Sequence, residues 1–563
     1  MRIETNERTY DRDVIVIGGG VNGTGVARDL SLRGLKVALF ERNDISFGAS
    51  GNSSGMIHGG PRYLTHDPDV THSSCLDSGH IQRIAPHLLF RIPFLMPVHR
   101  ERPNARIALT LLDAFFEAYD RYQPLKHGKP HTRLSAEDLR TLEPGLTANT
   151  VGGVSFDEWG IDGSRLCIAS AVDAIEHGAS VCVHTEVTEI LRHPDGAVRG
   201  VRIRDRITGA RAELTAPVVV NATGAWAPLT ASLGGLPAER ARVRPGKGIH
   251  IFFERRLLNY ALIANAIDGR MVFVQPWQNM TVVGTTDDDY YGDLDNVIAT
   301  TDEVRYLLEA VADIFPAIRS ARAIGTWAGV RPTLYEWGRN EDELSREHQI
   351  VDHTEHGAPG LFSMLGGKLA SYRLFSEELS DVVAGRLGVK ARSTTHQKPL
   401  PGGEIQIDPL QLADQVKMEP MAATRLEYRH GARALRIAER IKNNPKEATI
   451  VCVCEPVTEA EVRYVVEHEL VRTVGDVARR TRLGLGTCGG MRCAARCGQI
   501  VAEMTGRSPL EGQRMALQFA SFAQARRVAA VGPAQARQEA LTTASLRSQV
   551  GAVQGLGQEL EEG

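Results

Sequence analysis

The sequence predicts an α/β protein with several domains, and three observations support this fold class. An apolar strand, residues 14–17, runs into a glycine-rich loop, residues 18–23, and then into a helical pattern. Two more glycine turns follow, one at Gly224 and one at residues 366–367. Near the C-terminus, five of the eight cysteines lie within residues 452–497. Because 563 residues exceed what one hydrophobic core requires, we expect two or three domains.

Composition and charge describe an ordinary folded protein. Hydrophobic residues make up 42% of the chain and charged residues 24%, which excludes global disorder. A net charge of -3 does not favour nucleic acid as a partner. No apolar run reaches the roughly 18 residues of a spanning helix, and the N-terminus lacks the apolar core of a signal peptide. We therefore expect a cytoplasmic protein, with contact to the inner face of the cell membrane as an open alternative.

The first glycine loop fits a dinucleotide. Gly18 permits the tight turn, Gly20 lets the backbone approach a pyrophosphate, and Gly23 allows close packing of helix and strand. The helix that follows offers free N–H groups to phosphates. A second strand, residues 36–40, ends at Glu41, where a carboxylate can accept hydrogen bonds from a ribose. The alternative is a glycine-rich turn with a structural role only.

The two later glycine turns favour a flavin over a nicotinamide. Gly224 follows the apolar strand of residues 218–221, and residues 366–367 follow about 140 positions later. Separated turns indicate a large Rossmann-like cofactor domain assembled from discontinuous segments. The chain between them is then expected to form an antiparallel sheet that covers the substrate. For the segment at Gly224, an unrelated core strand is the alternative.

Four further motifs support a resemblance to a known family. They are Ile57-His-Gly-Gly-Pro-Arg-Tyr-Leu, Val282-Val-Gly-Thr-Thr-Asp, Gly329-Val-Arg-Pro and Gly366-Gly-Lys-Leu-Ala-Ser-Tyr-Arg. From about residue 12 to 400 the chain resembles FAD-dependent glycerol-3-phosphate dehydrogenase. The resemblance implies that FAD is the cofactor, that sn-glycerol 3-phosphate is oxidised to dihydroxyacetone phosphate, and that a quinone or another molecule accepts the electrons. We also expect a homo-oligomer.

The resemblance implies a set of site residues as well. Arginine suits phosphate oxygens because its fork is planar, and lysine supplies a compact point charge. The substrate residues expected from the family motifs are Arg62, Tyr63, Arg331, Arg346 and Lys368. The expected cofactor-binding residues are Gly18, Gly20, Gly23, Glu41, Ser50, Ser54, Gly224, Gly366, Gly367 and Lys368.

Hydride transfer from a secondary alcohol also needs a base for the hydroxyl proton. Histidine titrates near neutrality, and His58 lies four residues before Arg62, so both can face one pocket. We rank His58 first and expect it to act with Arg331 and Lys368 as the catalytic set. His250, on a predicted strand, is one alternative; in another, His58 only hydrogen-bonds the flavin or the backbone.

The clustered cysteines indicate a metal site. In a chain without a secretory signal, thiolates bind soft metals or iron–sulfur clusters more often than they form a disulfide framework. Zinc ligands commonly pair as CxxC, whereas this chain has CxC and CxxxxC. The segment 479–493 resembles the ferredoxin-like [2Fe-2S] domain fused to the anaerobic type of the enzyme. This implies a [2Fe-2S] cluster, with zinc as the alternative, bound by Cys452, Cys454, Cys488 and Cys493.

Composition also predicts the domain boundaries. We expect an oxidoreductase body of discontinuous FAD and substrate domains over residues 1–400 and a helical cap or bridge over residues 404–446. The ferredoxin-like domain is expected over residues 447–510. Residues 511–563 are predicted to be a tail, partly helical or disordered, and we favour a mobile tail beyond about residue 530.

Three questions stay open at this stage. The apolar runs at residues 88–96 and 107–116, with arginines around them, predict either helices in a membrane interface or a buried helical hairpin. The family resemblance favours the first, and a separate subunit for membrane anchoring is a further option. An FAD-dependent 2-hydroxy acid or amino acid dehydrogenase or oxidase would need only one or two cations. A non-catalytic electron-transfer subunit with FAD and a cluster would lack a substrate cation or the base.

Overall fold

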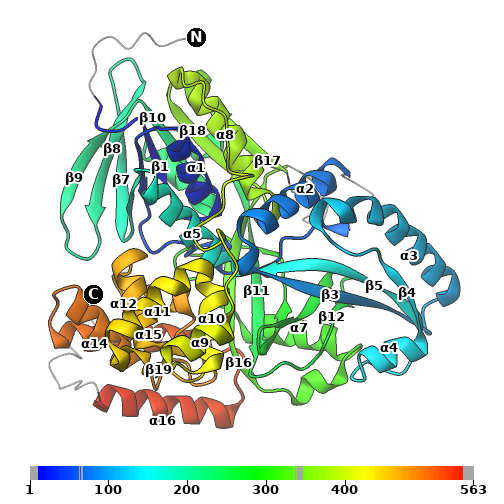
Figure 1. The fold of residues 1–563 in the computed structure, drawn as a ribbon. Helices are drawn as coiled ribbons and strands as arrows, with labels where there is room; N and C mark the ends of the chain where they lie inside the picture. The colour runs from blue at the N-terminus through cyan, green and yellow to red at the C-terminus, as the bar shows by residue number, and fades with distance from the viewer. Residues whose placement is uncertain (1–9, 62–63, 65–67, 337, 339–346, 550–563) are drawn as a thin grey trace.

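The structure is a computed structural model that describes residues 10–61, 64, 68–336, 338 and 347–549 (Figure 1). Its first sheet has six strands in the order β17-β18-β10-β1-β2-β6. All pairs in it are parallel except β17 with β18. Apolar side chains fill the central strands, which are buried on both faces, as expected of a parallel sheet. The strands are β1 (Val14–Ile17), β2 (Val37–Phe40), β6 (Ser180–Cys182), β10 (Val218–Asn221), β17 (His348–Asp352) and β18 (Leu361–Gly366).

Helices cover the first sheet on one face. Helix α1 (Val21–Leu32) packs against α5 (Gly163–Glu176) and α8 (Tyr372–Leu387), and their apolar residues share one buried cluster with the sheet. On the other face lie α6 (Ala227–Ser232) and a three-stranded sheet of β7 (Thr185–Arg192), β8 (Val198–Asp205) and β9 (Arg211–Thr215). Together they confirm the predicted α/β fold with a doubly covered parallel sheet.

The second sheet has nine strands and extends away from the first (Figure 1). Its pairs are antiparallel except for β12 with β3, so the predicted antiparallel insertion is present with one parallel pair. Helix α7 (Thr301–Ala312) packs on one face. The strands are β3 (Leu89–His99), β4 (Thr132–Ser135), β5 (Thr150–Ile161), β11 (Val243–Phe253), β12 (Ala261–Asn265), β13 (Met271–Trp277), β14 (Met280–Gly284), β15 (Asp288–Asp289) and β16 (Ala323–Leu334).

The apolar run at residues 88–96 is not helical, and both helical interpretations of it were wrong. It forms β3, which pairs along its whole length with β5. Pro93 and Pro97 explain the outcome, since a proline inside a helix removes a backbone hydrogen bond and clashes with the preceding turn. The second run does form a helix, α3 (Ala105–Tyr119), beside α2 (Pro68–Ile84) and near α4 (Ala136–Leu142) at the outer end of the sheet (Figure 1). No helix within the described ranges is both long and apolar enough to cross a membrane.

The C-terminal third is helical, with its own buried apolar cluster. A two-stranded ladder of β19 (Ile450–Cys452) and β20 (Val457–Thr458) is its only sheet among the described residues. The helices are α9 (Pro409–Val416), α10 (Pro420–His430), α11 (Ala434–Asn443), α12 (Glu459–His468), α13 (Val474–Thr481), α14 (Ala494–Met504), α15 (Pro509–Ala525) and α16 (Pro533–Gln549).

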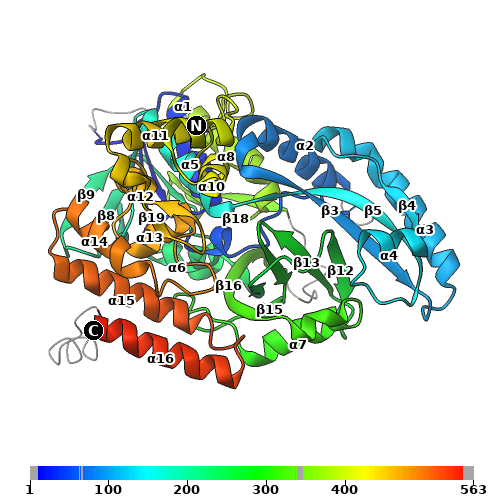
Figure 2. The same cartoon turned by 60° about the horizontal axis from the view of Figure 1, so that its bottom comes forward.

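Helix α16 corrects the expectation of a mobile tail beyond residue 530. It lies along α15 in Figure 2, and specific contacts hold it there. Arg527 forms an ion pair of 2.6 Å with Glu539, and Gln535 donates a hydrogen bond to the carbonyl of Ala323 in β16. The alanine-rich composition suits a helix, and these contacts fix its position.

Buried ion pairs join the helical third to the first sheet. Arg165 of α5 reaches Glu469 at 2.6 Å, and Arg480 of α13 reaches Asp44 at 2.5 Å. All four side chains are almost fully buried. The loop that follows β2 is therefore held by charges supplied from the C-terminal helices.

Candidate active site

The glycine loop between β1 and α1 has the backbone geometry that a phosphate-binding turn needs. Gly18 has φ +108°, and a Cβ there would lie 2.7 Å from the carbonyl oxygen of Ala222. A Cβ on Gly23 would lie 2.0 Å from the oxygen of Gly18, so only glycine allows the helix to begin this close to the strand. Gly20 is the N-cap of α1 and supplies no side-chain cap, which leaves N–H groups at the helix end for a ligand.

Glu41 lies at the carboxyl end of β2, beside this loop. Its two oxygens accept hydrogen bonds of 2.7 Å from the N–H of Gly19 and 2.8 Å from the N–H of Asn43. Burial raises the pKa of the carboxyl, and these two bonds oppose that shift. Glu41 thus anchors the loop at the point where the sequence predicts a ribose.

A cavity of about 480 Å³ opens between the two sheets at the end of the glycine loop. Asn22 and Ser50 line it at the loop, and the Oδ1 atom of Asn22 is buried without a hydrogen-bond partner within the described residues. Ser50 accepts a 3.0 Å hydrogen bond from the N–H of Val21. An unpartnered polar atom, an uncapped helix end and a glycine cradle together fit an elongated, phosphate-bearing cofactor such as FAD.

The same cavity brings together most of the described residues that the sequence predicts for the site. Those that line it are Ser50, Ser54, His58, His250, Arg331, Gly366, Gly367 and Lys368. Gly224 has φ +59° and does not line the cavity itself. A Cβ on it would lie 3.8 Å from Pro332, which does line the cavity. Arg62, Tyr63 and Arg346 lie outside the described residues.

His250 is buried deep in β11. Its Nε2 lies 2.9 Å from the hydroxyl of Ser54, and its Nδ1 has no partner within the described part of the chain. Burial, helped by the charge of Arg331, lowers the pKa of His250 to about 3. The ring is therefore neutral at physiological pH, and a base with so low a pKa takes up a proton poorly.

Arg331 comes from β16 and is held by the segment that follows β14. Its Nη1 lies 2.7 Å from Asp287, and its Nη2 donates hydrogen bonds of 3.0 Å to the hydroxyl of Thr285 and to the carbonyl of Thr286. The side chain is 26% exposed and lines the cavity. A guanidinium fixed in this way presents a positive charge to the cavity in one orientation.

The sequence motifs did not single out every charged residue of this group. Asp287 also lies 3.5 Å from guanidinium nitrogens of Arg244 and Arg270, and Arg270 lines the cavity. The sequence offered one signal for Asp287, namely its place at the end of the motif at residues 282–287. That signal was not used to assign it to the site. Arg270 follows a surface turn between two strands, and nothing in its local sequence indicates that the turn leads into the site.

The clustered cysteines gather around one loop. Cys452 ends β19, Cys454 follows it, and Cys488 and Cys493 flank the loop before α14. The pKa values of two of these thiols are lowered, that of Cys452 to about 7 and that of Cys488 to about 5. The neighbouring Cys493 is the main cause in both cases. The Sγ atom of Cys454 lies 3.5 Å from the hydroxyl of Thr487, the residue before Cys488. Cys497 is fully buried in α14 and packs in the apolar cluster.

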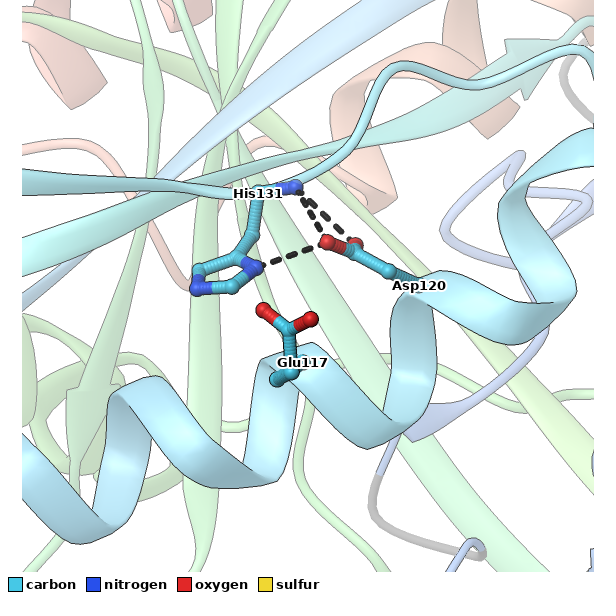
Figure 3. A group of neighbouring side chains, drawn as sticks. All are labelled: Glu117, Asp120 and His131. Carbon is cyan, nitrogen blue, oxygen red and sulfur yellow. Dashed lines mark hydrogen bonds and ion pairs between the residues drawn. The ribbon is translucent and has the colours of Figure 1, made fainter.

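Another group of side chains could in principle bind a cation. Glu117, Asp120 and His131 place three ligand atoms within 4.8 Å of one another beside α3 (Figure 3). Both ring nitrogens of His131 already face carboxylates, Asp120 at 2.8 Å and Asp113 at 3.1 Å. Burial lowers the pKa of His131, but the hydrogen bonds and charges of these two carboxylates outweigh it and raise the pKa overall. We assign this group to an ion pair that fastens the start of β4 to α3.

Comparison with known families matches most of the chain. Residues 13–373 match the family described as FAD dependent oxidoreductase. Residues 393–511 match the C-terminal domain of alpha-glycerophosphate oxidase, a range that includes the five clustered cysteines.

Individual relatives agree with this match. The chain is 33% identical over 498 residues to a subunit of the anaerobic glycerol-3-phosphate dehydrogenase of Escherichia coli, covering 87% of this chain and 88% of that protein. It is 31% identical over 415 residues to the aerobic glycerol-3-phosphate dehydrogenase of Staphylococcus haemolyticus, covering 72% and 73%. Among solved structures, the glycerol-3-phosphate dehydrogenase of Bacillus halodurans complexed with FAD has a TM-score of 0.71 at 23% identity, covering 94% of this chain and 97% of that one.

Proposed function

Because the chain belongs to the FAD-dependent glycerol-3-phosphate dehydrogenase family, we propose that it oxidises sn-glycerol 3-phosphate to dihydroxyacetone phosphate. The observation on which the proposal depends most is the group of His58, Arg331 and Lys368 on the wall of one cavity. It combines a candidate base with cations for a phosphate dianion, next to a glycine cradle for a cofactor.

In this proposal the residues of the first sheet bind FAD. The N-terminus of α1 would hold the pyrophosphate, Glu41 would hold the ribose, and Ser50 and the turn at residues 366–367 would line the flavin side of the cavity. FAD, when bound, supplies the hydride acceptor. The chain supplies everything else: binding, orientation and proton transfer.

Arg331 and Lys368 bind the phosphate and orient the substrate. A phosphate dianion in a cavity needs at least one paired cation, because an uncompensated charge loses much of its hydration. Thr285, Thr286 and Asp287 fix the guanidinium before substrate arrives, so little side-chain entropy is lost on binding. Arg62, Tyr63 and Arg346 are proposed to complete the site on the strength of the family motifs.

His58 is the proposed base for the hydroxyl proton. The low pKa of His250 argues against that residue, since an effective base has a pKa near the working pH. His250 instead positions the turn that precedes His58, through its contact with Ser54.

For the four cysteines we propose a [2Fe-2S] cluster that passes electrons onward. A single zinc ion, with Zn–S bonds of about 2.3 Å, would hold its sulfur ligands about 3.8 Å apart. Within the described residues, no three of these sulfurs lie within 4.8 Å of one another. The CxC and CxxxxC spacing of these cysteines differs from the CxxC pairs common at zinc sites, and this spacing supports the cluster.

Contact with a membrane is proposed at α3. Ile107 and Leu111 are 60% and 67% exposed on its outer face, and Arg106 lies beside them. Apolar side chains next to cations are typical of helices that lie in a membrane interface. Sedimentation with vesicles that contain or lack anionic lipid tests this part of the proposal. Recovery of all the protein in the supernatant with both kinds of vesicle would refute it.

The experiment that tests the main proposal is an anaerobic titration of the FAD-loaded protein with sn-glycerol 3-phosphate, followed by the visible absorbance of the flavin. Bleaching with one equivalent, followed by loss of the iron–sulfur absorbance, is the expected result. Lactate and glycine serve as comparison substrates. If either of these bleaches the flavin and glycerol 3-phosphate does not, the chain acts on a carboxylate and the proposal is wrong.

A further inference from the structure

The proposed mechanism leaves one buried acid on the wall of the 480 Å³ cavity without a role. Glu158 comes from β5, its side chain is 3% exposed, and it lines this cavity together with Lys368. Two other acids line the cavity among the described residues, but Asp287 already pairs with Arg331, and Glu347 lies at the surface. The role of the Glu158 carboxylate is therefore the open question about this wall.

Two neighbours hold the Glu158 side chain in place. Its Oε1 accepts a 2.7 Å hydrogen bond from the hydroxyl of Tyr119, and its Oε2 lies 2.6 Å from the Nζ atom of Lys126. Lys126 also donates hydrogen bonds of 3.2 Å to that hydroxyl and 2.9 Å to the carbonyl of Asp157. Since Tyr119 and Lys126 are fully buried, the carboxylate has one fixed orientation and a counter-charge beside it.

The carboxylate keeps acceptor capacity that these neighbours do not use. Its two oxygens can accept about four hydrogen bonds in all. Oε1 accepts one, and Oε2, although it forms the ion pair with Lys126, is buried without a hydrogen-bond partner in the part of the chain that the structure describes. A buried acceptor of this kind on a cavity wall indicates a donor that is supplied from the cavity.

The wall next to Glu158 is apolar. Phe156 lies two positions earlier in β5, on the same face of the sheet, and its ring centroid is 5.2 Å from that of Phe94 and 4.5 Å from that of Phe116. All three rings line the cavity. A hydroxyl group placed here would lose its hydration and need a partner, because burying an unpaired hydroxyl is unfavourable. Glu158 can be that partner.

Glu158 also lies close to the proposed substrate cation Lys368. Burial raises the pKa of the Cys75 thiol to about 12, and the charges of Glu158 and Lys368 both act on that thiol. The turn that carries the proposed base packs on the same group, since a Cβ on Gly59 would lie 2.2 Å from the Sγ atom of Cys75 and 2.5 Å from the hydroxyl oxygen of Tyr119. The carboxylate, this turn and Lys368 thus border one part of the cavity.

We propose that Glu158 binds the C1 hydroxyl of sn-glycerol 3-phosphate. The substrate has three polar groups: the phosphate, the C2 hydroxyl that is oxidised, and the C1 hydroxyl, which does not react. An ionised carboxylate accepts hydrogen bonds and donates none, so it suits the O–H of a primary alcohol. The inference rests on the proposed function and adds the residue that recognises the glycerol end of the substrate.

The test compares two substrates of the FAD-loaded, full-length protein. (R)-Propane-1,2-diol 1-phosphate has the phosphate and the reacting hydroxyl of sn-glycerol 3-phosphate in the same configuration, but a methyl group replaces the C1 hydroxymethyl group. The ratio of kcat/KM for the two substrates is measured with an artificial acceptor. We expect the unchanged protein to favour glycerol 3-phosphate about tenfold to a hundredfold, the effect of one hydrogen bond to a charged group.

Two variants and a control assign this preference to a residue. Glu158→Gln removes the charge and keeps the shape of the side chain, and it should lower the ratio about tenfold by weakening the reaction of glycerol 3-phosphate. A second variant, Glu158→Met with Lys126→Met, removes both charges, so that neither stays buried without a partner. Glu143→Gln is the matched control, because Glu143 is also almost fully buried, lies outside the lining of the cavity, and accepts a 2.6 Å hydrogen bond from the N–H of Asn259. The control should keep the ratio of the unchanged protein.

A lower ratio in both Glu158 variants, with the control unchanged, supports the assignment. Equal kcat/KM for the two substrates in the unchanged protein would overturn it. A high ratio that both variants keep would also overturn it, since Glu158 would then serve only as the ion-pair partner of Lys126. In both of these cases glycerol 3-phosphate still reduces the flavin, and the proposed function stands. If it does not reduce the flavin of the unchanged protein at all, the proposed function is wrong and the role of Glu158 is wrong with it.

Discussion

Replacing Arg331 by glutamine tests the proposed substrate site most directly. The change removes the charge but keeps a polar, shorter side chain. Asp287 would not be left without a cation, because Arg244 and Arg270 each remain 3.5 Å away. The variant is therefore expected to fold, so that a loss of activity reports on the substrate and not on the protein.

The size of the loss follows from the geometry of Arg331. A hydrogen bond to a charged group contributes about 1.5–3 kcal/mol. Since the side chain is 26% exposed, water screens part of the interaction and the lower value applies to each bond. Because Thr285, Thr286 and Asp287 already take up hydrogens of both Nη atoms, we count one bond to the phosphate, which gives about 1.5 kcal/mol, or about a tenfold lower kcat/KM.

Steady-state kinetics with an artificial acceptor measures this effect. The value of kcat/KM for sn-glycerol 3-phosphate is compared with that for glycerol, which has no phosphate to bind. The loss is expected for the phosphate substrate only, and Arg319→Gln, at an exposed ion pair with Glu309, should change neither value. A loss below threefold, or an equal loss for glycerol, would refute the phosphate role of Arg331.

Three other changes have defined outcomes. Arg165→Met should lower the free energy of unfolding by about 3–5 kcal/mol in a denaturant titration, because it leaves the buried Glu469 without its main partner. Adding Glu469→Gln to the same chain should restore part of the lost stability. His131→Gln should destabilise the protein most below about pH 6.5 and progressively less as the pH rises through the raised folded-state pKa, so a constant difference in melting temperature across that range would contradict the ion pair. Cys488→Ala should lose bound iron and sulfide by elemental analysis whereas Cys497→Ala retains them, and zinc in the unchanged protein would contradict the cluster.

Much of the fold could be predicted because its signals are local. The glycine loop needs φ +108° at Gly18 and no Cβ at Gly23. Glycine is the residue that meets both requirements, so the sequence itself indicates the loop. The parallel strands are short apolar runs beside such loops, and the capping residues of α12 and α15 precede their helices directly. For the same reason, short motifs indicated His58, Arg331 and Lys368, and these three residues line one cavity.

The errors have a physical cause as well. An apolar run such as residues 88–96 suits a buried strand and a buried helix equally, and only Pro93 within it argued for the strand it forms. Helix α16 was expected to be mobile because its composition gives no apolar face. Its order depends instead on contacts with Ala323 and Arg527, which local patterns do not predict.

A second cavity, of about 340 Å³, is lined by the segment 43–55, by α15 and by the segment after α15, and it depends on such distant contacts. Arg526 and Asn52 are 474 residues apart, and Asn52 in turn donates hydrogen bonds to the carbonyls of Phe47 and Gly48 in the segment between the two cavities. A change in how the segment after α15 docks on β16 would therefore move the wall of the second cavity while leaving Arg331 and its partners in place. The wall of the second cavity and the group around Arg331 can for this reason vary separately in this chain, since they come from different segments and share only the loop that lies between the two cavities.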